Sequence, residues 1–185
     1  MITADMKAHF FTRTNKHIDL VGKYIDKIIK KVPSLSDLES MKDLHDKSKF
    51  EEPEMTPYIW LTWKYKCARE GVPFDVSDEL EKKMNDVTIH HIINSKHHPE
   101  FWDEEFDPDI MFNDKDRDDV PEKPVNATRM PLIYIAEMIA DWCAVAEERK
   151  TCPYGWLEKN LNTRWIFSKR QLIFIELLLD NIWKK

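Results

Sequence analysis

Apolar residues recur at three- and four-residue spacing along most of this chain, and this period constrains the fold more than any other feature. The 185 residues include only three glycines, and few stretches alternate apolar and polar residues as β-strands do. A chain of this length is sufficient for one domain with a real core. The sequence therefore predicts an all-α fold, a single helical domain over residues 1–185.

Cap residues and breakers place the ends of the expected helices. Ser36 with Glu39, and Ser168 with Gln171, have the spacing of capping boxes, and Pro33 stops the first helix. The expected helices are about Asn15–Val32, a second from Ser36 that carries His45 and Asp46, 56–71 with Thr56 as cap, 78–97 with Ser77 as cap, 131–148, and 168–183.

Residues 99–128 lack this period, because they are acidic and interrupted by prolines. They are expected to form a long loop before the penultimate helical region, either a lid over a neighbouring surface or a solvated linker. The apolar last helix is expected to be buried, with the seam of a homodimer as the alternative.

Composition excludes several function classes. With 28 basic and 34 acidic residues the net charge is -6, so neither duplex nucleic acid nor an anionic membrane is an expected partner. A small anionic ligand held by a local positive site remains possible. No apolar run is long enough to cross a membrane, and the three cysteines do not form a CxxC pattern. We expect a soluble, cytoplasmic protein without disulfides.

Two histidines continue the apolar stripe of the helix expected at 78–97. The stripe comprises Leu80, Met84, Val87, His91, Asn94 and His98. Because Pro99 disfavours helical geometry at His98, either His97 or His98 could turn into a site, and His90 points elsewhere. A lone histidine on such a stripe is more often a core residue than a ligand, but two in register favour a site.

Three further residues are candidates to face the interior of the protein. His17 lies on the apolar stripe of the first helix, with Leu20 and Val21. Glu137 and Asp141 are four residues apart in a segment that is apolar almost all round, where a buried carboxylate is costly unless a cation pairs with it. Asp141 is the stronger candidate, since Glu137 could equally face solvent.

Together these residues have the donors of a transition-metal site. The expected ligands are His17, His45, Asp46, His91, His98 or His97, and Asp141. Nitrogen and oxygen donors suit Fe, Mn, Co, Ni or Zn, and this number of donors is enough for one or two divalent ions. Neighbouring helical side chains diverge by about 100°, so His45 could bind one ion while the Asp46 carboxylate bridges two. The metal-site core is then about 15–148, and 156–185 is a C-terminal extension.

The order of these residues resembles the HD-domain superfamily, whose pattern is His, His-Asp, Asp. His17 matches the first His, "HDKSK" matches an "HDxGK" form with Ser48 in place of glycine, and Asp141 matches the last Asp. His91 and His98 would fill two additional His positions of dinuclear members. The blocks "HDKSKF", "NSKHHPE" and "EMIADW" are also similar to a small bacterial and phage family that has no established substrate.

The resemblance implies a metal-dependent phosphohydrolase that acts on a nucleotide or another small phosphate ester, with metal-bound hydroxide as nucleophile. Asp46 would then belong to the catalytic centre. Lys49, one helical turn past Asp46, would contact phosphate, although a solvated lysine is equally compatible with the sequence. Glu137 would orient a ligand imidazole or act as general acid or base. Possible orienting residues or alternative ligands are His90, Asn94, His97 and Glu100.

Two other functions remain open from the sequence. HD-type proteins with two irons can be oxygenases that act on small polar substrates. The site could also belong to a non-enzymatic metal- or ligand-binding module. Metal identity and turnover distinguish the three.

Overall fold

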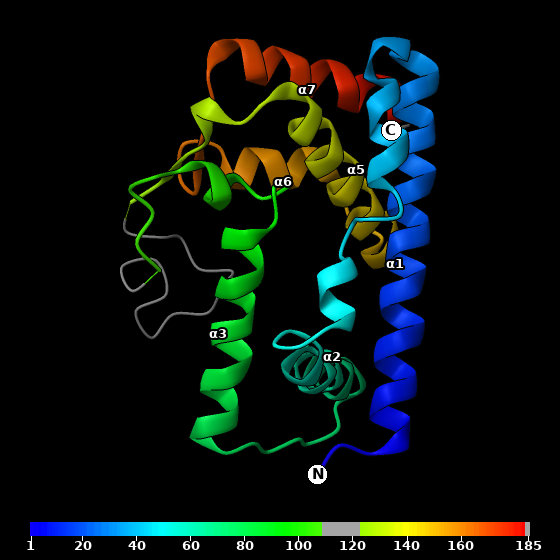
Figure 1. The fold of residues 1–185 in the computed structure, drawn as a ribbon, viewed down its shortest axis with the longest axis vertical. Helices are drawn as coiled ribbons and strands as arrows, with labels where there is room; N and C mark the ends of the chain where they lie inside the picture. Colours follow the sequence, from blue (N-terminus) through cyan, green and yellow to red (C-terminus); the bar gives the residue numbers. More distant parts are fainter. Residues whose placement is uncertain (109–122, 184–185) are drawn as a thin grey trace.

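The computed structural model describes residues 1–108 and 123–183, and this part of the chain is mostly helical (Figure 1). The prediction of an all-α class is thereby confirmed. The helices are α1 (Ala4–Lys31), α2 (Met55–Glu70), α3 (Asp78–Asn94), α5 (Leu132–Arg149), α6 (Pro153–Asn160) and α7 (Lys169–Ile182). Short 3-10 helices are η1 (Pro33–Met41), η2 (Lys47–Phe50), η3 (Pro99–Trp102) and η4 (Ala127–Arg129). Two short parallel strands, β1 (Val125–Asn126) and β2 (Trp165–Ile166), pair with each other.

Helix α1 begins eleven residues before the predicted start at Asn15. Thr3 caps it by accepting a hydrogen bond from the Met6 backbone, and Met6 and Phe10 extend the buried stripe toward the N-terminus. Polar residues at 12–16 interrupt the apolar pattern, which is why the sequence suggested a later start. The correction places His9 inside α1.

The predicted second helix is wrong. Pro33 begins the 3-10 helix η1, and Ser36 does not cap a helix. The chain then enters a turn, so His45 and Asp46 lie in irregular backbone instead of on a helix. Asp46 has φ 56° and ψ 12°, in the left-handed region. The doublet is therefore positioned by a turn, and the divergence of about 100° between neighbouring helical side chains does not apply to His45 and Asp46.

Other expected helix ends agree more closely. Gly71 ends α2 in a left-handed conformation, and Ser77 caps α3 by accepting from the Leu80 backbone. The capping box of Ser168 and Gln171 is present at the start of α7. Two boundaries differ: α2 begins at Met55, with Glu54 at the cap position instead of Thr56, and α3 ends at Asn94 instead of His97.

The predicted loop at 99–128 is only partly described. Its described ends contain η3, β1 and the beginning of η4, so they are more ordered than expected. Residues 109–122, which include the acidic middle, lie outside the described residues. Helix α6 was not predicted, because it is short and contains Gly155.

Two clusters of buried side chains are connected by α1. The larger joins α1, α5 and α7, and the smaller packs the N-terminal part of α1 against α2 and α3. Figure 1 shows α1 and α3 on opposite sides of the molecule, with α5, α6 and α7 at one end. On α1, Phe10 belongs to the smaller cluster and Val21 to the larger, and His17 lies between them.

Helix α7 buries one side and exposes the other. Ile175, Leu178 and Leu179 are fully buried in the larger cluster, as expected for a buried last helix, and the C-terminal region therefore packs directly on α1 and α5. Ile173 and Leu177 are exposed. A homodimer through this helix stays a prediction. In the described part of the chain, no helix is both long and apolar enough to span a membrane.

Candidate metal centre

Residues from four separate segments converge between the two clusters. His17 comes from α1, His45 and Asp46 from the turn after η1, His91 from the last turn of α3, and Asp141 from α5. His97 and His98 follow α3. All are buried except His98 and Asp141, which are partly exposed. The structure thus brings together every metal ligand that the sequence suggested.

Asp46 is at the middle of this group. Its Oδ2 atom accepts a hydrogen bond from Lys49 Nζ at 2.6 Å and lies 3.7 Å from His17 Nε2. Its Oδ1 atom is 3.1 Å from His91 Nε2 and 3.9 Å from His97 Nε2. One buried carboxylate therefore faces three imidazoles and one ammonium group.

Two carboxylates contact the imidazoles from α5. Asp141 Oδ1 lies 3.0 Å from His17 Nε2. Glu137 Oε1 lies 3.0 Å from His45 Nδ1 and 3.6 Å from His97 Nδ1. Because an ionised carboxylate can only accept, His45 donates from Nδ1, and its Nε2 atom is left to face the centre. Glu137 is buried, so it lies where it can orient His45.

A third buried carboxylate, Glu54, orients His91. Its Oε2 atom lies 3.0 Å from His91 Nδ1 and accepts a hydrogen bond from Ser48 Oγ at 3.0 Å. Its Oε1 atom lies 3.0 Å from His90 Nδ1. Burial opposes its ionisation, but His91 and its other hydrogen-bond donors lower the pKa of Glu54. Ser48, which replaces the glycine of the "HDxGK" form, thus ties the His-Asp turn to Glu54.

Three groups of donors could each hold an ion within the described residues. They are His17 with His45 and Asp141, His45 with Asp46 and His97, and His91 with His97 and His98. In each group the donor atoms lie within 4.8 Å of one another. The first two groups share His45 and the last two share His97, so the three form one continuous set. His97, expected only as an alternative to His98, belongs to two groups.

The other suggested residues lie at the edge of the set or beyond it. His90 contacts Glu54 but has a side chain that is 43% exposed. Asn94 is exposed and donates to the His90 backbone oxygen of its own helix, so the inward stripe of α3 ends at His91. Glu100 is buried and accepts a hydrogen bond from Trp165 Nε1 at 2.9 Å.

Unpaired buried atoms support the fit of a cation. His45 Nε2 is buried and has no hydrogen-bond partner in the part of the chain that the structure describes. Asp46 Oδ1 and His91 Nε2 are also buried, and within that part of the chain they lie 3.1 Å from each other without a further hydrogen-bond partner. Such atoms are normally paired in native proteins. Divalent ions bound in the neighbouring groups of donors would give these atoms a partner, since imidazole nitrogen and carboxylate oxygen are both ligands of Mn, Fe, Co, Ni and Zn.

The pKa shifts of Asp46 and His45 also agree with a bound cation. Burial opposes ionisation of Asp46, but Lys49, His45 and His91 outweigh it and hold the pKa of this carboxyl well below its usual range. Burial also disfavours the cation of His45, yet Asp46, Glu137 and Asp141 outweigh it and raise the pKa of His45. The carboxylates thus favour positive charge at this position, which a metal ion would also supply.

His97 and Asp141 are each held in the form that binds a metal. Burial and the adjacent His45 hold the pKa of His97 well below its usual value, so this imidazole is neutral. Burial opposes ionisation of Asp141, but His17, which hydrogen-bonds to it, and His45 outweigh burial and lower the pKa of Asp141. A neutral imidazole and an ionised carboxylate are the required ligand forms.

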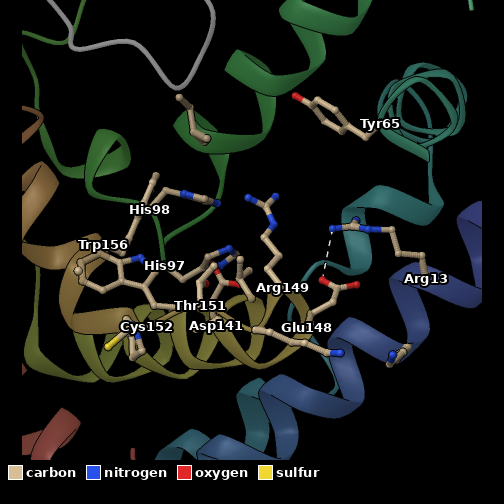
Figure 2. Close-up of a pocket in the computed structure, with 18 of the residues that line it drawn as sticks. Arg13, Tyr65, His97, His98, Asp141, Glu148, Arg149, Thr151, Cys152 and Trp156 are labelled. Atoms are coloured by element: carbon tan, nitrogen blue, oxygen red, sulfur yellow. Dashed lines mark ion pairs between the residues drawn. The ribbon is translucent and has the colours of Figure 1, made fainter. Parts of the chain in front are cut away.

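A cavity of about 1270 Å³ opens beside the centre (Figure 2). His97, His98 and Asp141 lie in its wall, so the cavity gives access to the centre. Three acidic residues line it, Asp141, Glu148 and Glu100. Six basic residues line it, Arg13, Lys16, Arg69, Arg149, Lys150 and Arg164. The wall is therefore cationic, although the whole chain carries a net charge of -6.

Sequence reasoning missed Glu54 and the cationic wall. Glu54 stands in the acidic run "FEEPEMTP", which looks solvated, and no spacing rule connects it to His91. The basic residues of the wall come from α1, α2 and α5 and from the segments that follow α5. Each of these stretches looks like an ordinary solvated surface by itself.

Comparison with known proteins gives a family and no function. No curated protein and no solved structure matches the chain. The sequence model described as "Family of unknown function (DUF5662)" matches residues 6–181, which is nearly the whole chain. The protein therefore belongs to the DUF5662 family.

Proposed function

We propose that this protein is a metal-dependent phosphohydrolase of the HD type, which acts on a nucleotide or another small phosphate ester. One observation carries the proposal: connected groups of imidazoles and carboxylates that suit divalent ions open onto a cavity with a cationic wall. The donor set suits the metals of hydrolytic enzymes. The wall suits an anionic substrate.

The proposed ligands follow the HD pattern and add to it. His17, His45, Asp46 and Asp141 would hold one ion, with Asp46 shared by a second ion that His91 and His97 or His98 would hold. The group of His17, His45 and Asp141 supports the first ion, and the adjoining groups that contain Asp46, His97 and His91 support the second. When bound, such ions lower the pKa of a water molecule toward neutrality and neutralise phosphate oxygens.

The residues around the ligands have separate proposed roles. Glu137 and Glu54 fix the ring orientations of His45 and His91, since each accepts from the Nδ1 atom of its partner. Lys49 lies within hydrogen-bond distance of Asp46 and 5.1 Å from the centroid of the Tyr58 ring. It would hold Asp46 in its ionised form and offer its remaining N–H groups to a substrate phosphate.

The cationic cavity favours phosphate esters over neutral substrates. Arginine binds phosphate oxygens with a planar pair of N–H groups, and four of the six basic residues in the wall are arginines. We place the activity in the cytoplasm, because the three cysteines are odd in number and form no CxxC pattern, which is typical of proteins from a reducing compartment.

Phosphate release from a panel of nucleotides and simple phosphate esters tests the proposal, with Mn, Co, Ni, Zn or Fe added in turn. We expect release that is lost in Asp46→Asn and kept in Asp43→Asn, an exposed residue of the same turn. Two irons per chain with oxygen consumption would contradict the proposal and support the HD-type oxygenase. Bound metal without turnover of any substrate would support a binding module.

A further inference from the structure

We infer that the cavity contains a second anion-binding subsite, formed by Arg13, Arg69 and Arg149, and that the ligand carries two phosphate groups. One phosphate would lie at the metal centre and the other at this subsite. The inference rests on the proposed function in one respect, since the first phosphate is placed at the metal centre.

Helices α1 and α5 place two of these arginines away from the centre in the same direction. His17 pairs with Asp141, and Arg13 pairs with Glu148 at 3.6 Å, so the two helices run antiparallel here. Arg13 precedes His17 by four residues, which is about 6 Å along the helix axis. Arg149 follows Asp141 by eight residues, which is about 12 Å along the axis. The subsite is thus one to two turns from the centre.

The third arginine, on α2, faces the same end of the cavity. Burial and the positive charges of Lys66, Arg69 and Arg13 lower the pKa of His9, a residue of the wall. Arg69 and Arg13 therefore both lie near His9 in the cavity wall, although they come from two different helices. In Figure 2 the Arg149 side chain extends into the cavity between His98 and Arg13.

Two of the arginines are available to bind an anionic ligand. Among the residues that the structure describes, neither Arg69 nor Arg149 forms an ion pair. Their neighbours on the same helices are paired, because Lys66 binds Glu70 and Glu147 binds Lys23. Carboxylates are thus available on these helices, yet the two arginines that line the cavity remain without one.

The size of the cavity suits an extended ligand. Its volume of about 1270 Å³ is larger than the ~300–1000 Å³ of most small-ligand pockets. A ligand with a single phosphate, bound at the metal centre, would leave the arginine end of the cavity unfilled. A second phosphate would place a second negative charge in the part of the cavity that Arg13, Arg69 and Arg149 line, and arginine binds phosphate oxygens through a planar pair of N–H groups.

Binding of two phosphonates to the Mn-loaded protein tests the inference. Hexane bisphosphonate has two anionic ends and hexylphosphonate has one, and neither has a phosphate ester bond to hydrolyse. Calorimetric titration would compare the wild type with Arg69→Gln and Arg149→Gln. The matched control is Arg170→Gln, an exposed arginine on α7 outside the cavity wall.

We expect the bisphosphonate to bind wild type about tenfold more tightly than the monophosphonate. Arg69→Gln and Arg149→Gln should each remove most of this advantage and leave monophosphonate affinity nearly unchanged, while Arg170→Gln alters neither. Equal affinity of the two ligands for wild type would overturn the subsite, as would equal weakening of both ligands by the cavity variants.

The result is separable from the proposed function. If phosphate esters are hydrolysed but the two phosphonates bind equally, the subsite is wrong and the hydrolase stands. If the bisphosphonate binds more tightly and no ester is hydrolysed, the subsite stands and the hydrolase is wrong.

Discussion

Glu54 and His91 are 37 residues apart in sequence, and their Oε2 and Nδ1 atoms lie 3.0 Å apart in the buried centre. Glu54 is at the cap position of α2 and His91 is in the last turn of α3, so this contact connects two helices. It also directs the His91 Nε2 atom toward Asp46 Oδ1, 3.1 Å away. The position of one proposed ligand thus depends on a carboxylate that no motif marks.

Replacing Glu54 should weaken metal binding without removing a ligand. In Glu54→Gln the His91 ring loses its charged acceptor, and we expect about a 10- to 100-fold lower metal affinity. Titration of the chelator-treated protein with Mn measures the effect. Glu51→Gln, an exposed acid in the same run, is the control and should bind like wild type. Equal affinities for wild type and Glu54→Gln would show that Glu54 does not position His91.

Lys49 should affect turnover more than metal content. Its ammonium group is the nearest cation to Asp46, and its loss in Lys49→Met removes positive charge from the place where phosphate would bind. We expect kcat for phosphate esters to fall about 100-fold while bound metal changes little. Lys49→Arg should restore part of kcat, and Lys47→Met, an exposed neighbour, should be neutral. If bound metal and kcat fall together, Lys49 acts by holding Asp46 and does not contact the substrate phosphate.

Helical periodicity predicted the parts of the site that lie on helices. His17, His91 and Asp141 interrupt apolar stripes, and such stripes can be read directly from residue spacing. The turn that carries His45 and Asp46 was mispredicted, because the capping-box spacing of Ser36 and Glu39 outweighed the effect of Pro33.

Contacts between distant segments were not predictable in the same way. Glu54 reaches His90 and His91 across 36 and 37 residues, and the arginines of the cavity meet only after α1, α2 and α5 have packed. Tertiary packing decides which side of a polar helix faces a cavity, and a single sequence does not contain that information.

Helix α7 gives a matched test of the packing. Leu178 is fully buried in the larger cluster, while the adjacent Leu177 is 47% exposed. Leu178→Ala should lower the free energy of unfolding by about 2–5 kcal/mol, because it leaves a cavity. Leu177→Ala should change it by less than about 0.5 kcal/mol. Urea denaturation of the metal-free proteins compares them, and similar losses for both variants would contradict the described orientation of α7.

Metal should also stabilise the folded chain. Ions that bind the native state and not the unfolded chain raise the free energy of unfolding by mass action, about 2.7 kcal/mol at 100 times Kd. We therefore expect Mn to raise the Tm of wild type but not that of His45→Ala, which removes a donor common to two groups. Mn that leaves the Tm of wild type unchanged would contradict a site in the folded protein.

The most direct test of the central claim is elemental analysis of protein purified without added metal, read as ions per chain. The proposal predicts one or two equivalents of Mn, Fe, Co, Ni or Zn in wild type and in Asp43→Asn, and a large loss in Asp46→Asn. Wild-type protein without any of these metals, which also fails to bind them when they are supplied, would contradict it.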